Sequence, residues 1–164
     1  MSDITRKLTR AKASGTYRLD GEVAALERGA RAAGLDFARI GLGAVSDKTG
    51  LLDAIARTLG FPDTFGSNWD ALADCLGDLS WREAPGHVFV IDGIAGLACG
   101  DAEGFATLLD ILNDTATFWR GQKRPFFAVI AGELPAGVVL PVLALHPHEH
   151  VRTDPRGPVP GCCG

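Results

Sequence analysis

Apolar residues recur along this chain with the periods of strands and of helices. Short apolar runs of the strand type occupy three segments: Phe37–Leu42, His87–Asp92 and Pro125–Ile130. Apolar residues spaced three and four apart predict four helices: Glu22–Ala33, Ser46–Leu59, Trp69–Leu79 and Asp101–Trp119. Strands that alternate with helices favour a parallel sheet covered by helices. The pattern therefore predicts an α/β fold with a small parallel sheet of three to four strands.

The same pattern divides the chain into three parts. Residues 1–35 form an N-terminal extension that holds a short strand or turn and a helix, and residues 36–132 hold the strongly patterned elements. Residues 133–164 form a C-terminal extension that contains six of the nine prolines. Because prolines interrupt regular structure, we expect this extension to be irregular, ordered at first around Val138–Leu145 and disordered from about His150.

The helix predicted at Trp69–Leu79 has two sharply different faces. At about 100° per residue, Asp74 and Asp78 lie within about 80° of Asp70, and the apolar side chains lie on the opposite side. Phe61–Trp81, the segment around this helix, holds four acidic residues and no lysine or arginine. One face of the helix therefore packs inward, and the other presents a column of aspartates.

Repulsion within the aspartate column calls for an explanation. Like charges spaced four residues apart destabilise a helix by roughly 0.2–0.5 kcal/mol per pair. The helix dipole favours Asp70 in the first turn, but it gives no such support to Asp74 or Asp78. Two interpretations stay open: the face is reserved for a cationic partner, or it is simply solvated and screened by salt. Phe65 in the preceding loop is likewise either part of a binding edge or part of the core, and Ser67 or Asn68 can cap the helix.

Charge is distributed unevenly along the chain. The formal net charge is -4, with 13 acidic against 7 basic residues in Asp36–Gly132 and 4 against 7 in Met1–Leu35. Net acidity argues against nucleic acid as a direct partner and fits a basic protein. The four cysteines have no disulfide-framework spacing, and neither a signal peptide nor a membrane span is visible. We therefore expect a cytoplasmic protein without membrane contact that is monomeric when free.

The 15 residues Pro62–Leu76, with the sequence PDTFGSNWDALADCL, resemble the signature of the barstar family. Members of that family are small inhibitors of barnase-type ribonucleases. The order of the predicted elements over roughly Phe37–Ala131 is also similar to that of the family. The resemblance implies a barstar-like fold, in which one helix and the loop before it enter the active site of the ribonuclease.

The resemblance also implies which residues bind the partner. Five candidates match the motif, and Asp114 on the long helix matches a further contact position of the family. Asp78 is added because it extends the aspartate column. The seven candidates are Phe65, Gly66, Asn68, Asp70, Asp74, Asp78 and Asp114. Two positions depart from the family pattern, because Thr64 stands where an aromatic residue is usual and Ala73 where the best-known member has a tryptophan.

We accordingly expect an inhibitor rather than an enzyme. It would bind a basic extracellular-type ribonuclease, occlude its active site and protect the producing cell, with no cofactor. The alternative is a barstar-like interaction module whose partner is not a ribonuclease, and the departures at Thr64 and Ala73 keep this alternative open.

Other motifs give weaker signals. Gly41–Ser46 resembles half of a dinucleotide-binding turn but lacks the third glycine. His146–His150 (HPHEH), the Cys162–Cys163 pair and the aspartate column are each conceivable metal ligands. The histidine segment is short and lacks the context of a helix or strand, the cysteine pair fits a free terminus equally well, and the aspartate column lacks the spacing of an EF-hand loop, so we expect no metal. Cys75 lies on the apolar side of its helix, which favours a core residue over a nucleophile.

Overall fold

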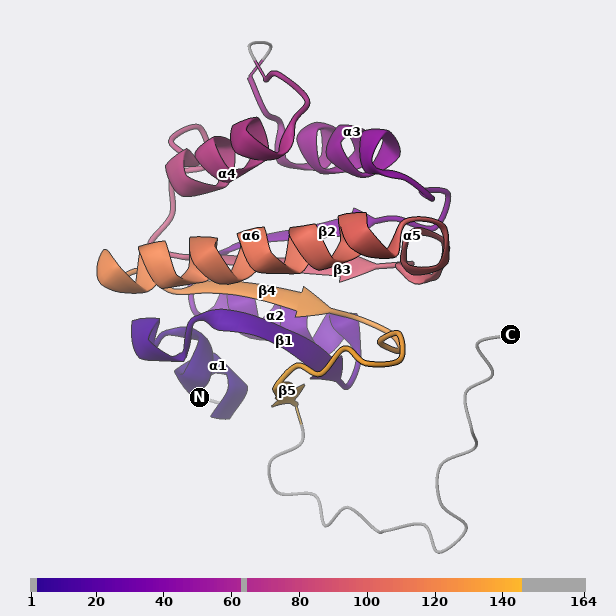
Figure 1. The fold of residues 1–164 in the computed structure, drawn as a ribbon. Helices are drawn as coiled ribbons and strands as arrows, with labels where there is room; N and C mark the ends of the chain where they lie inside the picture. The colour runs from indigo at the N-terminus through magenta and orange to yellow at the C-terminus, as the bar shows by residue number, and fades with distance from the viewer. Residues whose placement is uncertain (1–2, 63–64, 146–164) are drawn as a thin grey trace, which may run out of the picture.

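A computed structural model describes residues 3–62 and 65–145 of the protein. Five parallel strands lie side by side in these residues in the order β2-β3-β4-β1-β5 (Figure 1). The strands are β1 (Gly15–Asp20), β2 (Asp36–Gly41), β3 (His87–Asp92), β4 (Phe126–Ile130) and β5 (Val142–Ala144). The helices are α1 (Asp3–Leu8), the 3-10 helix η1 (Ala11–Ala13), α2 (Val23–Ala32), α3 (Lys48–Leu59), α4 (Trp69–Asp78), α5 (Ala95–Gly100) and α6 (Ala102–Gly121).

The predicted α/β class and parallel sheet are confirmed, but the predicted strand count of three to four was too low. Strand β1 pairs with β4 from Gly15↔Phe127 to Arg18↔Ile130. A strand from residues 1–35 therefore lies beside β4, the last of the three strands that the apolar runs predict. Strand β5 then pairs with the outer side of β1 from Arg18 to Asp20. These two strands extend the sheet beyond β4, whereas β2, β3 and β4 are the strands that the apolar runs predict.

Helices cover both faces of the sheet (Figure 1). One face packs against α3, α4, α5 and α6, around the buried side chains of Phe89, Ile91 and Phe126. The other face packs against α1 and α2, around Val90 and Phe127. Because β3 and β4 are buried on both faces, their sequences are continuous apolar runs, as expected for the central strands of a parallel sheet.

Helix boundaries follow local capping chemistry. Helix α3 begins at Lys48, two residues later than predicted, because Asp47 is its N-cap and accepts the hydrogen bond of the Gly50 amide through its carboxylate at 2.9 Å. Asp101 caps α6 in the same way, by accepting from the amide of Gly104 at 2.9 Å. The short helix α5 was not predicted, because its six residues are too few to set a helical period.

Within the described ranges, no helix combines the length and the apolar character that a membrane span requires. The disorder expected from about His150 concerns residues outside the described part of the chain, as do the HPHEH segment and the Cys162–Cys163 pair.

Candidate partner-binding surface

Helix α4 begins and ends through specific contacts. The side chain of Asn68, at the N-cap, accepts the hydrogen bond of the Ala71 amide at 2.7 Å and satisfies a donor that the first turn leaves free. Leu72 and Leu76 are fully buried on the inner side of the helix. At the C-cap, Leu79 takes the left-handed conformation with a φ of 48°, which turns the chain away while its own side chain stays buried.

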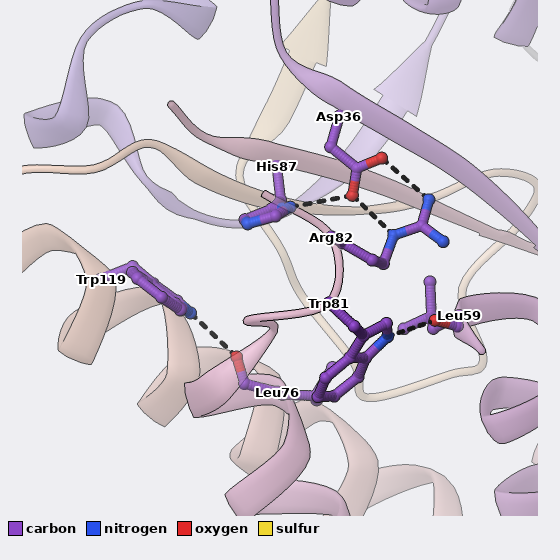
Figure 2. Close-up of polar contacts among 7 residues, drawn as sticks. All are labelled: Asp36, Leu59, Leu76, Trp81, Arg82, His87 and Trp119. Atoms are coloured by element: carbon purple, nitrogen blue, oxygen red, sulfur yellow. Dashed lines mark hydrogen bonds and ion pairs between the residues drawn. The ribbon is translucent and has the colours of Figure 1, made fainter. Parts of the chain in front are cut away.

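Two tryptophans tie α4 and its flanking loop to the rest of the fold (Figure 2). The indole Nε1 of Trp119, on α6, donates to the Leu76 carbonyl at 2.9 Å. The indole of Trp81, which follows α4, donates to the Leu59 carbonyl at the end of α3, at 2.8 Å. Both bonds use backbone carbonyls near helix ends, where the helix itself supplies no donor. The inner side of α4 is therefore fixed in place while its outer side stays free.

A partly buried polar cluster holds the connection from α4 to β3 (Figure 2). Arg82 donates two hydrogen bonds to Asp36, from Nε at 2.7 Å and Nη2 at 2.8 Å, and Nδ1 of His87 lies 2.9 Å from the same carboxylate. An ionised carboxylate only accepts, so Nδ1 of His87 is the donor. Burial alone would raise the pKa of Asp36, but the hydrogen bonds and charges of Arg82 and His87 outweigh burial and lower it. Burial lowers the pKa of His87, against the opposing effect of Asp36.

The loop before α4 is anchored by an aromatic contact. The rings of Phe65 and Phe61 meet edge to face with centroids 4.9 Å apart, and Phe61 makes a similar contact with Trp81 at 5.8 Å. Phe65 is half-buried against the core, so it supports the loop and keeps part of its ring exposed. Gly66 is exposed, and Ser67 has a positive φ of 53°, so the backbone turns sharply just before the cap.

Asp70, Asp74 and Asp78 are exposed on the outer side of α4, as the helical spacing predicts. None of the three forms an ion pair with a residue that the structure describes. Asp78 accepts one weak hydrogen bond, from the Ser80 hydroxyl at 3.3 Å. Burial raises the pKa of the Cys75 thiol, and the charges of Asp78 and Asp74 raise it further. A raised pKa disfavours the thiolate, so this cysteine is poorly suited to be a nucleophile.

Helix α6 completes the surface. A shallow groove of about 380 Å³ lies between α4 and α6, and both helices contribute residues to its lining: Ala73, Asp74, Gly77, Ile111, Asp114, Thr115 and Phe118. Asp114 is exposed and, within the described residues, has no ion pair. Phe118 is 47% exposed, which is unusual for so large an apolar side chain. The groove therefore combines two carboxylates with an apolar wall.

The structure brings some of the candidate residues together and separates others. Asp74 and Asp114 line one groove, although 40 positions separate them in the sequence. Asp70 and Asp78 share the outer side of α4, and Asn68 serves first as its cap. The sequence pattern did not single out Phe118. At about 100° per residue it lies about 120° from Leu112, off the apolar stripe of α6, and an aromatic residue in that position is a signal for a surface contact.

The competing motifs find little support. The turn after β2 packs closely on the turn after β3, because a Cβ on Gly93, which follows β3, would lie only 2.6 Å from the amide nitrogen of Gly43. Among the residues that the structure describes, no group of three or more His, Cys, Asp or Glu side chains is placed to hold a metal ion. The HPHEH and double-cysteine segments lie outside those residues.

Comparison with solved structures finds a shared fold. The ORC2 protein of Aeropyrum pernix, in its ADPNP–ADP complexes, matches with a TM-score of 0.55 at 19% sequence identity. The match covers 79% of this chain and 38% of that one, so this chain spans well under half of that protein. At this identity the likeness concerns the fold alone. No curated protein is significantly similar in sequence.

Comparison with protein families gives a specific match. The family model described as Barstar (barnase inhibitor) matches residues 35–131, more than half of the chain. The matched region runs from the start of β2 to the end of β4 and includes α4, its capping loop and the facing side of α6. The chain therefore belongs to the barstar family.

Proposed function

We propose that this protein is an inhibitor that binds a basic ribonuclease and occludes its active site with α4, the 65–68 loop and the facing side of α6. One observation carries the proposal. Four exposed carboxylates on these elements, those of Asp70, Asp74, Asp78 and Asp114, have no ion pair with any described residue. Within the protein nothing described compensates their mutual repulsion, and a cationic surface would do so.

The inhibition would be electrostatic and steric. An enzyme that cleaves RNA holds phosphate groups with cationic side chains, and carboxylates presented on a rigid helix can take the place of those phosphates. The anchors of α4 support this mechanism, because a helix fixed by Trp119 and Trp81 loses little further freedom on binding. The protein itself would perform no chemistry and would need no cofactor.

The groove between α4 and α6 gives the proposed interface a defined recess. Ala73 and Gly77 leave room between the helices, Phe118 forms an apolar wall, and Asp74 and Asp114 supply charge. A protruding cationic side chain of the ribonuclease, with its apolar stem against Phe118, fits this composition. Aromatic side chains beside charged groups are frequent hot spots of protein interfaces.

A second candidate is a barstar-like interaction module whose partner is not a ribonuclease. The observation that favours it is Ala73, which is exposed and lines the groove at a position where the best-known member of the family has a tryptophan. A small residue there removes a large contact and changes the shape that a partner must fill. The two candidates share the surface and differ in the enzyme activity of the partner.

We place the protein in the cytoplasm as a free monomer that protects its producing cell. The two cysteines in the described residues, Cys75 and Cys99, are free thiols, which fits a reducing compartment. This placement rests on the proposed inhibition, because an exported ribonuclease endangers the cell only before it leaves.

Titration into a barnase assay with RNA substrate tests the proposal. We expect activity to fall to zero near an equimolar ratio, because one inhibitor would block one active site. Asp74→Asn should weaken inhibition, since it removes a central charge at nearly constant shape. Asp53→Asn is the matched control, because Asp53 is an exposed carboxylate on α3 that pairs with Arg57. Full activity of barnase and of other basic ribonucleases at excess protein would instead favour the second candidate.

A further inference from the structure

A second charged surface lies at the edge of the sheet where the strands begin. Because β1 and β4 are parallel neighbours, the segments that precede them meet at this edge. The Phe126 amide donates to the Ser14 hydroxyl at 2.9 Å, and the guanidinium of Arg120 donates to the Ser14 carbonyl. The chain before β1 and the end of α6 are therefore joined, although more than 100 residues separate them in the sequence.

Both segments are rich in basic residues. Seven of the 16 lysines and arginines lie on them, and we call this set the basic pole: Arg6, Lys7, Arg10, Lys12, Arg120, Lys123 and Arg124. All are exposed except Lys7, which is half-buried. None of the seven pairs with a carboxylate in the described ranges 3–62 and 65–145. Uncompensated cations in one place form an electrostatic footprint for a polyanion.

Four of these cations line an open pocket of about 520 Å³, together with Ala13 and Tyr17. Nζ of Lys7 lies 5.0 Å from the centroid of the Tyr17 ring, and that ring also stacks on Phe127 with centroids 5.8 Å apart. Since Lys7 and Phe127 already occupy the Tyr17 ring, it offers no free platform for a nucleobase. The pocket therefore offers positive charge, and its volume exceeds what a single phosphate group would fill.

The basic pole is not built for membrane insertion. A membrane-surface helix places an apolar face in the lipid, but the apolar side chains of α1 face inward, with Ile4 8% and Leu8 0% exposed. A cationic surface on a helix whose apolar side is buried suits the phosphates of a nucleic acid instead, because phosphates bind mainly through charge.

We propose that the basic pole binds the phosphate backbone of a nucleic acid, without reading its sequence. This activity is distinct from the function proposed for α4, because the four cations that line the pocket lie on and after α1, and α1 and α4 lie on opposite faces of the sheet (Figure 1). The other three cations lie at the end of α6, on the same face as α4. The net charge of the whole chain gives no sign of the basic pole, because it is a sum in which carboxylates elsewhere outnumber these seven cations.

Fluorescence anisotropy with labelled oligouridylate tests RNA binding over a salt series. We expect binding at low salt that weakens steeply as salt rises. The double variant Arg6→Gln and Arg10→Gln should bind the oligonucleotide more weakly at every salt concentration. Each lost phosphate contact with a single strand makes the slope of log affinity against log salt shallower by about 0.7, so the two substitutions together should change it by about 1.4. No hydrogen bond or ion pair of these side chains holds the described fold, so the variant should keep the melting temperature of the wild type.

The control variant Arg39→Gln with Arg57→Gln removes the same charge from exposed positions on β2 and α3 and should leave RNA binding nearly unchanged. If the first variant unfolds, Lys12→Gln with Lys123→Gln tests the same pole. Each of the following results would overturn the proposal: no binding at low salt, equal losses in test and control variants, anionic vesicles bound in preference to RNA, or tripolyphosphate bound as tightly as the oligonucleotide.

Discussion

His87 makes the stability of the fold depend on pH. The side chain is 2% exposed, and burial lowers its pKa below the ordinary value of 6.5. The unfolded chain therefore binds a proton near pH 6.5, whereas the folded protein binds it only at lower pH. Between these two values the unfolded state holds more protons, so the free energy of unfolding falls as the pH falls below about 6.5. Asp36, whose pKa is lowered by Arg82 and His87, adds a further loss at pH below its ordinary 3.8.

We expect the His87→Gln variant to lose most of the pH dependence between about pH 7 and 5, although it will be less stable at neutral pH because a buried partner of Asp36 is altered. Urea unfolding at a series of pH values measures both effects. The control is the Asp74→Ala variant, which keeps His87. Its free energy of unfolding should depend on pH as that of the wild type does. A wild-type protein whose unfolding free energy is flat over this range would contradict the assignment.

Asp74 should affect the free protein only slightly. It is exposed, has no ion pair among the described residues, and stands four positions from Asp70 and from Asp78. Asp74→Ala removes two repulsive spacings, so we expect the free protein to be as stable or more stable, by up to about 1 kcal/mol. Thermal unfolding measures the change. A marked loss of stability would mean that the carboxylate supports the fold.

At the scale of the element, α4 depends on its N-cap. Asn68→Ala removes the acceptor of the Ala71 amide bond and should lower the free energy of unfolding by about 1 kcal/mol, within the range of roughly 0.5–2 kcal/mol usual for cap residues. Asn68→Asp keeps an acceptor oxygen, and its charge is favoured at the start of a helix, so it should unfold like the wild type. Equal losses in both variants would mean that the amide group of Asn68 has another role.

The elements predicted from the sequence are those whose buried residues repeat with a clear period. Strand β3 is buried along nearly its whole length and α4 has one apolar side, so both were recognised. Strand β1 was ambiguous because only Thr16 and Leu19 of its six residues are buried. Strand β5 was missed because it has a single buried residue, Leu143, and no period can be read from one residue.

The candidate surface was predicted in part for the same reason. The helical period places Asp70, Asp74 and Asp78 on one side of α4, so their exposure followed from the sequence. No local period reveals that α4 and α6 form a groove, because that depends on tertiary packing of the two helices. The contribution of Phe118 to the groove therefore required the structure.

At the scale of the whole molecule, charge is divided between faces. Acidic side chains on α4 and α6 face away from the sheet on one side, and the basic pole lies at the edge where β1 and β4 begin. A basic ribonuclease would be attracted to the first surface and repelled by the second. The rate of association should therefore fall steeply between low and physiological ionic strength, with a much smaller change in dissociation.

Stopped-flow mixing of the protein with barnase at increasing salt measures this rate. Neutralising the basic pole with Arg6→Gln and Arg10→Gln should not slow association, because it removes only repulsion. An association rate that does not change with salt would contradict electrostatic steering by the aspartate face.

The dissociation constant of the Asp74→Ala variant for the ribonuclease tests the proposed inhibition most directly. Asp74 lies mid-column on α4 and also lines the groove with Asp114 and Phe118, so it stands at the centre of the proposed interface. Removing one member of a desolvated charge pair costs about 2–5 kcal/mol or more, and the barnase–barstar pair is itself one of the complexes on which this range is based. We predict a complex weakened by at least about thirtyfold, the equivalent of about 2 kcal/mol. A variant that binds the ribonuclease as tightly as the wild type would contradict the proposed role of this surface.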